Sequence, residues 1–197
     1  MKKIMMVLLI LCMTVTMLIR PVNVEAANKD ACKVTISRKE IGVRERAIIY
    51  GRNKSGKVVW KYKTTTQISV DIDKFEFFVN GKYVYIFDYT TLVKVRKKDG
   101  KILWKTKKVL PDGRSVCFDK KGNIYMCEYY GTRMYKVSSK GKILWKINFG
   151  KTGLYFPYKM KYNKGTVKVY CDASSEDYSI HHFLYVNAAN GKIKKYI

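Results

Sequence analysis

The sequence predicts an all-β fold built from four similar repeats. A turn followed by a tryptophan occurs as Ser55–Trp60, Asp99–Trp104 and Lys140–Trp145, and a fourth copy, Asn190–Tyr196, has lost its Trp. Successive turn glycines lie 44, 41 and 50 residues apart; they are Gly56, Gly100, Gly141 and Gly191. A period of roughly 40 to 50 residues is typical of one four-stranded blade per repeat. We therefore expect a β-propeller of about four four-stranded blades.

Each repeat contains short runs rich in β-branched and aromatic residues, separated by turns that contain Gly. The blades are expected near residues 33–63, 75–106, 115–149 and 156–197. The expected strands are Val34–Ser37, Arg44–Arg52, Lys57–Lys63, Phe75–Val79, Tyr83–Phe87, Leu92–Arg96, Ile102–Thr106, Ser115–Phe118, Asn123–Cys127, Arg133–Val137, Ile143–Phe149, Tyr158–Tyr162, Thr166–Cys171, Phe183–Asn187 and Lys192–Ile197. The sequence shows no helical pattern outside its N-terminal segment.

The first repeat offers three strands, not four. One resolution is ring closure, in which an N-terminal strand joins the last blade and removes the exposed sheet edges. Closure would bring Cys32 close to Cys171, where a disulfide could form. The alternative is a homodimer in which two chains pair into an eight-blade ring.

Residues 1–26 resemble a secretory signal peptide rather than part of the fold. Lys2 and Lys3 precede an apolar run from Ile4 to Ile19, and a small-residue site follows at Val24–Ala26. This pattern predicts cleavage after Ala26, which leaves 27–197 as the propeller domain of a secreted or cell-envelope protein. An uncleaved N-terminal membrane anchor is the alternative, although the apolar run is short for a spanning helix.

The chain is strongly basic, with a formal net charge of +25. Without the signal segment it keeps 37 basic and 14 acidic residues, a net charge of +23. Such a chain associates with anionic surfaces. In the envelope the expected partners are an anionic cell-wall polymer, an acidic membrane surface or another envelope protein. No specific nucleic-acid module is recognised.

Four cysteines remain after cleavage, which permits disulfides in an exported protein. They are Cys32, Cys117, Cys127 and Cys171. If the Asp119–Gly122 turn pairs Phe118 with Asn123, Cys117 and Cys127 lie on opposite faces of the sheet, and we expect no bond between them unless the loop is one residue longer or shorter. No CxxC or adjacent Cys pair supports a zinc, haem or thiol-redox site.

Two strand-turn-strand units, Leu92–Trp104 and Met134–Trp145, resemble the quinoprotein-like (PQQ-like) propeller repeat. The resemblance covers roughly residues 47–197 and implies the propeller fold. Quinoprotein dehydrogenases of this family look like rings of seven or eight blades with an adjacent cysteine pair over the quinone. Because this chain has about four repeats and no adjacent cysteines, we expect no quinone cofactor. The resemblance is closer to the non-enzymatic propellers that act as envelope scaffolds.

The three tryptophans, Trp60, Trp104 and Trp145, occupy the same place in their repeats. We expect each indole to fill the wedge between successive blades, because each can bury on the order of 200 Å². The alternative is a ring of aromatic side chains on which sugars stack.

Lysines gather in the turns between first and second strands and between third and fourth strands, which emerge on one face of a propeller. They are Lys54, Lys57, Lys82, Lys97, Lys98, Lys101, Lys120, Lys121, Lys140, Lys142, Lys164 and Lys192. One interpretation is solubility alone. The other is a docking face for an anionic polymer or membrane, to which each Lys would contribute roughly 1 kcal/mol.

Acidic residues follow the second strands, at Asp88, Glu128 and Asp172. They could cap turns or pair with nearby lysines. The alternative is a ring of carboxylates near the axis that holds Ca²⁺ through oxygen ligands.

The sequence contains little that indicates catalysis. The histidines, His181 and His182, lie in the longer insertion Ala173–His182, beside Glu176 and Asp177. We expect a solvated loop, and the alternative is that the His pair ligates a metal. Longer loops on rigid propellers tend to carry function. No nucleophile elbow, phosphate-binding loop or zinc-protease motif is present. We therefore expect a non-enzymatic binding or scaffold protein. The alternative is a secreted hydrolase or lyase with a site at the propeller axis.

Overall fold

A computed structural model describes residues 30–42, 44–65, 67–68, 77–88, 90–107, 115–128, 131–173 and 182–197. For residues 67, 68, 107, 172 and 173 it describes the backbone only. The predicted signal peptide lies outside these residues. Within them, no helix is long and apolar enough to cross a membrane.

The prediction of an all-β propeller is confirmed: the described chain forms four four-stranded antiparallel sheets. Of the described residues, only the single 3₁₀ turn η1 (Gly150–Thr152) is helical. The strands are β1 (Lys33–Ile41), β2 (Arg44–Arg52), β3 (Val58–Lys63) and β4 (Gln67–Ile68) in the first blade, β5 (Phe77–Asn80), β6 (Tyr83–Asp88), β7 (Thr91–Arg96) and β8 (Ile102–Lys107) in the second, β9 (Val116–Phe118), β10 (Ile124–Cys127), β11 (Arg133–Val137) and β12 (Ile143–Asn148) in the third, and β13 (Leu154–Asn163), β14 (Thr166–Ala173), β15 (His182–Asn187) and β16 (Ile193–Tyr196) in the fourth.

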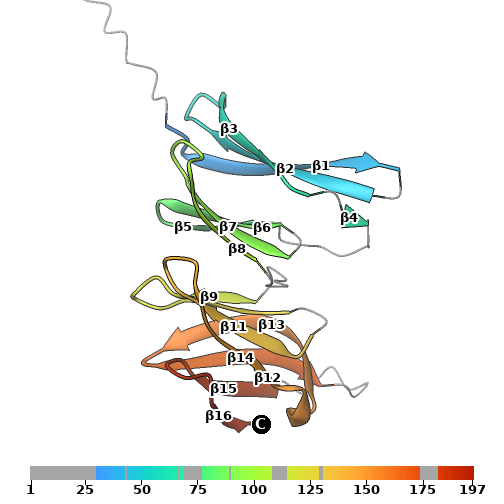
Figure 1. Ribbon diagram of the computed structural model, residues 1–197, viewed down its shortest axis with the longest axis vertical. Coiled ribbons are helices and arrows are strands. Elements are labelled where there is room, and N and C mark those ends of the chain that lie inside the picture. Colours follow the sequence, from blue (N-terminus) through green and yellow to red (C-terminus); the bar gives the residue numbers. More distant parts are fainter. Residues whose placement is uncertain are drawn as a thin grey trace, which may run out of the picture.

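The four blades form an open array rather than a closed ring. Figure 1 shows them one after another along the long axis, with the first and last sheets at opposite ends. Strand β1 pairs with β2 of its own blade, and Ala31 N donates a hydrogen bond to Lys98 O of the second blade at 2.7 Å. Ring closure through the N-terminal strand is therefore wrong. So is the Cys32–Cys171 disulfide, because Cys32 is exposed beside the first blade whereas Cys171 is buried between the third and fourth blades, at the other end of the array.

Within the described residues, the first blade has no counterpart of the strand that is innermost in the others. Trp60 lies in β3, whereas Trp104 and Trp145 lie in the fourth strands β8 and β12. In each case the Trp strand pairs with the strand before it, so β3 corresponds to the fourth strand of a complete blade. The two-residue strand β4 pairs with β2 beyond the end of β3 and does not fill the innermost place.

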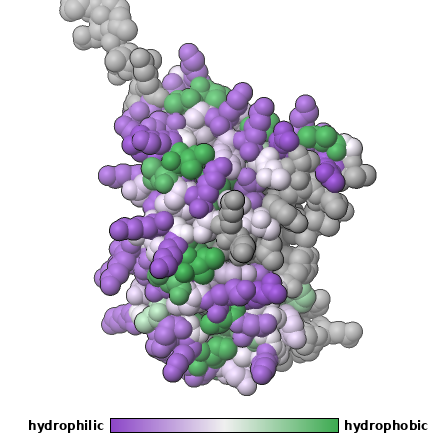
Figure 2. Space-filling model, viewed as in Figure 1, coloured by the Kyte–Doolittle hydropathy of each residue, from purple (hydrophilic) through white to green (hydrophobic). Residues whose placement is uncertain are grey.

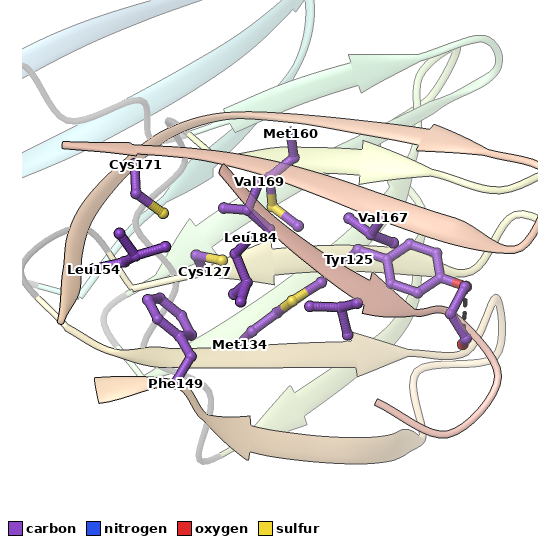
Figure 3. Packing of buried hydrophobic residues seen from close by; sticks show 12 residues of the cluster. Tyr125, Cys127, Met134, Phe149, Leu154, Met160, Val167, Val169, Cys171 and Leu184 are labelled. Carbon is purple, nitrogen blue, oxygen red and sulfur yellow. Dashed lines mark hydrogen bonds between the residues drawn. The ribbon is translucent and has the colours of Figure 1, made fainter. Parts of the chain in front are cut away.

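The hydrophobic core lies between blades. Three clusters of buried residues fill the spaces between successive sheets, and the largest joins the third and fourth blades. Figure 3 shows Tyr125 and Met134 of the third blade facing Val167, Val169 and Leu184 of the fourth. Because inner strands are covered on both faces, runs such as β6 and β10 are buried almost without alternation.

The predicted strand pairing in the third blade, on which the placing of its cysteines depends, is wrong by one residue. Phe118 pairs with Ile124, not with Asn123, and Tyr125 pairs with Cys117. Asn123 stays in the turn because its backbone N–H and its side chain both donate to the Asp119 carboxylate, at 2.9 and 2.8 Å. Cys117 and Cys127 therefore share a face and join one core cluster, yet both remain free thiols. Burial raises the pKa of Cys117 to about 12, so this thiol stays protonated.

The repeated Trp and the repeated Gly meet between blades. Each indole Nε1 donates to a carbonyl in the third-to-fourth turn of the next blade: Trp60 to Lys97 at 2.6 Å, Trp104 to Ser139 at 2.9 Å and Trp145 to Ala188 at 3.2 Å. The turn glycine of that next blade lies against the same indole. A Cβ added to Gly100 would come within 2.6 Å of Trp60, and one added to Gly141 within 2.7 Å of Trp104.

Candidate functional site

The turns that carry the predicted lysines define what we call the hairpin face. These turns lie on the left side of Figure 1, and Figure 2 shows hydrophilic side chains along the same side. Eleven of the twelve predicted lysines are exposed, and Lys97 is half-buried. The exposed members are Lys54, Lys57, Lys82, Lys98, Lys101, Lys120, Lys121, Lys140, Lys142, Lys164 and Lys192.

The hairpin face contains a pocket of about 500 Å³ at the second blade. Three of the predicted lysines line it together, Lys82, Lys97 and Lys98, and Ala31, Gly81, Tyr83 and Arg96 complete its wall. Two hairpins of the blade thus bring their lysines to one hollow. The sequence predicted these lysines as members of a basic docking face and did not indicate the pocket.

The backbone around this pocket is held from several sides. Lys97 N donates to Lys82 O at 2.8 Å, which joins the two hairpins. The carbonyls of Lys97 and Lys98 point inward, where they accept hydrogen bonds from Trp60 Nε1 and Ala31 N. The lysine side chains therefore extend from a fixed frame, which lowers the conformational cost of binding an anion.

The pocket keeps a net positive charge because three lysines line it, although an ion pair neutralises its one arginine. Arg96 Nε donates to Asp99 Oδ1 at 2.9 Å and Arg96 Nη2 donates to Asp99 Oδ2, in a two-pronged ion pair. Arg96 beside it lowers the pKa of Asp99 to about 2, so the pair stays ionised at any ordinary pH. The three lysines are left to meet an incoming anion.

Two buried lysines form a feature that sequence reasoning missed. Lys94 of β7 and Lys136 of β11 are 7% and 8% exposed. Lys94 Nζ lies 3.4 Å from Ser139 O and 3.9 Å from the centre of the Tyr83 ring, while Lys136 Nζ lies 2.7 Å from Ala188 O. These carbonyls are also the acceptors for Trp104 and Trp145. A pattern in the sequence could have indicated them: in both repeats a single Lys interrupts an apolar run, as Val93-Lys94-Val95 and as Tyr135-Lys136-Val137.

Of the predicted carboxylates, Asp88 joins two blades and Glu128 bonds within its own blade. Asp88 accepts hydrogen bonds from Tyr62 Oη at 2.8 Å and from Thr65 N at 2.7 Å, which join the first two blades. Glu128 accepts a hydrogen bond from Tyr135 Oη at 2.6 Å. Among the described side chains, no group of three or more His, Cys, Asp or Glu could hold a metal ion. The side chain of Asp172 lies outside them, so the Ca²⁺ site stays a prediction.

The histidine insertion is described only at its end. His182 begins β15, opposite Cys171 of β14. His181, Glu176 and Asp177 lie outside the described residues, and the predicted role of this loop stays open.

Stability is expected to fall as the pH rises above about 10, because tyrosines are buried between the blades. Burial is the main cause that raises the pKa of Tyr85 and of Tyr135, each to about 12. An unfolded tyrosine loses its proton near pH 10. The contribution of each phenol is therefore fully present below that pH and is lost as the pH rises from 10 towards 12.

A combined titration tests this: phenolate absorbance and circular dichroism should report a late group of tyrosines that ionises together with unfolding. The buried Lys94 and Lys136 change stability in the opposite direction. Burial lowers the pKa of each, because it disfavours the charged ammonium, so the folded state is stabilised as these lysines lose the proton at higher pH. The control is Tyr85→Phe, which should weaken the pH dependence. If every tyrosine ionised near pH 10 in a folded protein, the expectation would be wrong.

Comparison with known proteins identifies the fold of this chain but does not assign it to a family. No family model matches the sequence, and no curated protein matches it significantly. BamB from Moraxella catarrhalis is similar in structure, with a TM-score of 0.53 and 15% identity over 81% of this chain and 47% of that one. Hydrazine synthase from Kuenenia stuttgartiensis gives a TM-score of 0.52 and 13% identity over 82% of this chain and 47% of that one. The chain spans about half the length of these structures, and such low identity shows the propeller fold alone.

Proposed function

We propose that the protein is an exported, non-enzymatic binding protein that docks on a phosphate-bearing surface of the cell envelope through its hairpin face. The observation that carries this proposal is the pocket at the second blade, where Lys82, Lys97 and Lys98 converge. Its volume of about 500 Å³ suits a headgroup or one unit of a polymer. We assign the repeats to the quinoprotein-like type by their resemblance, without a quinone cofactor.

Charge favours this function over a purely structural role for the lysines. Lysines from all four blades emerge on the same face, so a planar or extended anion can contact several at once. Each Lys near an anionic surface contributes roughly 1 kcal/mol, so three together correspond to about a hundredfold in affinity. The signal peptide predicted from residues 1–26 would bring this face to the wall or to the outer leaflet.

Replacing the three pocket lysines tests the proposal. We expect Lys82→Gln/Lys97→Gln/Lys98→Gln to weaken binding about a hundredfold, measured by sedimentation with phosphatidylglycerol vesicles and by retention on an immobilised glycerol-phosphate polymer. The two probes distinguish a lipid headgroup from a wall polymer as the source of phosphate. Binding of the unmodified protein should decrease steadily towards about 0.5 M salt.

A charge-matched control is available on the last blade. Lys159→Gln/Lys161→Gln/Lys168→Gln removes the same three charges away from the hairpin face and should change binding by no more than about threefold. Equal losses in the two triple variants would mean that net charge alone drives association. No binding of either probe at low salt would also refute the proposal.

A further inference from the structure

The outer face of the last sheet carries lysines and aromatic residues that play no part in the proposed function of the hairpin face. Among the described elements, the third blade is the one that packs on β13–β16. The residues turned towards it form apolar rows such as Met160, Val169 and Leu184. The residues between them point the opposite way, and we call that side the terminal face.

Two cross-strand rows carry the lysines and aromatic residues of the terminal face, beside a polar row of Asn163, Thr166 and Asn187. One is Lys161, Lys168, Tyr185 and Lys195, and the other is Lys159, Tyr170, Phe183 and Ile197. Residues opposite one another in neighbouring strands share a face and lie side by side. Of these eight residues four are lysines, three are aromatic and none is acidic. The aromatic side chains are half-buried, whereas Lys159, Lys161 and Lys195 are exposed.

The aromatic rings position the lysines of this face. Lys168 Nζ lies 3.6 Å from the centre of the Phe183 ring and 4.8 Å from that of Tyr170. Lys159 and Lys195 likewise lie over Tyr170 and Tyr185, at 5.4 and 4.9 Å. Tyr170 and Phe183 meet edge to face at 5.3 Å, and Tyr158 lies 6.2 Å from Tyr170. Ammonium groups and rings therefore lie side by side on neighbouring strands, which are about 4.8 Å apart.

A second copy of this chain does not suit the terminal face. Two terminal faces would oppose lysine to lysine. The outer face of the first blade is also basic, since its register places Lys39 beside Arg46, Lys61 beside Tyr50 and Lys63 beside Ile48. Pairing of half-rings would further need an indole from the last blade, and Lys195 stands where the other blades have Trp.

We propose that the terminal face binds an acidic polysaccharide, with its carboxylates on the lysines and its sugar rings against Tyr170, Phe183 and Tyr185. Tyrosine offers a sugar its hydroxyl and its ring edge, even where an ammonium group lies over the ring face. A single-stranded nucleic acid needs open ring faces on which bases stack. Here ammonium groups already cover those faces, at the places where carboxylates can reach them. This site is separate from the pocket on the hairpin face.

Binding to polygalacturonate, with the full mature chain, tests the proposal. Lys159→Gln/Lys161→Gln/Lys168→Gln should weaken binding about tenfold or more. Lys82→Gln/Lys97→Gln/Lys98→Gln, with the same loss of charge, should change it by less than about threefold. Tyr170→Leu/Phe183→Leu keeps apolar bulk, removes the rings and should weaken binding about fivefold. The pocket and the terminal face therefore fail or succeed independently.

Several outcomes would overturn the proposal. These are equal losses in the two lysine variants, unchanged binding when the rings are removed, equally tight binding of neutral dextran, and tighter binding of an oligothymidylate that depends on the same lysines. The last result would make the terminal face a nucleic-acid platform. If the triple variant failed to fold, Lys168→Gln alone would carry the test, with an expected loss of about threefold, because Lys168 contacts both Tyr170 and Phe183.

Discussion

Trp104→Ala is expected to lower the free energy of unfolding by about 3–5 kcal/mol. The indole packs between the second and third blades, with its ring centre 6.1 Å from that of Tyr85 and its Nε1 bonded to Ser139 O. Removing it leaves a cavity in the hydrophobic cluster that joins these two blades. Urea denaturation followed by circular dichroism measures the change.

The control separates packing from hydrogen bonding. Trp104→Phe keeps much of the apolar area and loses only the indole N–H, so we expect a cost of about 1–2 kcal/mol. Ser139 O would keep Lys94 Nζ, at 3.4 Å, as a partner. An alanine variant with an unchanged melting temperature and weaker sugar binding would instead assign the tryptophans to a ligand.

The repeated turn and tryptophan predicted the blades because their effects are local. A glycine with positive φ ends a strand wherever it occurs, and an indole at a fixed distance from it repeats one contact. This is why the strands of the second blade lie within two residues of their predicted limits. The order of the sheets follows from the same repetition.

Ring closure could not be predicted in this way. Whether the first and last blades meet depends on the angle between successive sheets, which core packing sets and no short pattern encodes. The pairing in the third blade failed for a related reason. One side-chain carboxylate, that of Asp119, holds Asn123 in the turn and shifts the register by one residue.

The candidate sites were predicted unevenly. The lysines of the hairpin face follow from turn positions, but their convergence into a pocket depends on how two hairpins and Ala31 pack. The burial of Lys94 and Lys136 was not predicted, because a charged residue in a strand normally lies on the solvent side. In a propeller both sides of an inner strand are covered, and a carbonyl and aromatic rings from neighbouring strands take the place of water.

Gly100→Ala should cost far more than Gly56→Ala, although the two glycines occupy the same place in their repeats. Both have positive φ, 71° and 81°, so alanine is strained by about 1–2 kcal/mol at either position. An added Cβ at Gly100 would also lie 2.6 Å from Trp60, whereas at Gly56 nothing lies within 4 Å. Overpacking adds about 1–3 kcal/mol at Gly100 alone.

Chemical denaturation of the two alanine variants measures this difference, because the backbone term is common to both and cancels. We expect Gly100→Ala to be less stable than Gly56→Ala by about 1–3 kcal/mol. The double variant Trp60→Ala/Gly100→Ala should remove the clash, so the two substitutions should cost less together than the sum of their separate effects. Equal costs at the two glycines would show that the indole yields without penalty. The Trp–Gly contact would then be a consequence of blade packing, not one of its causes.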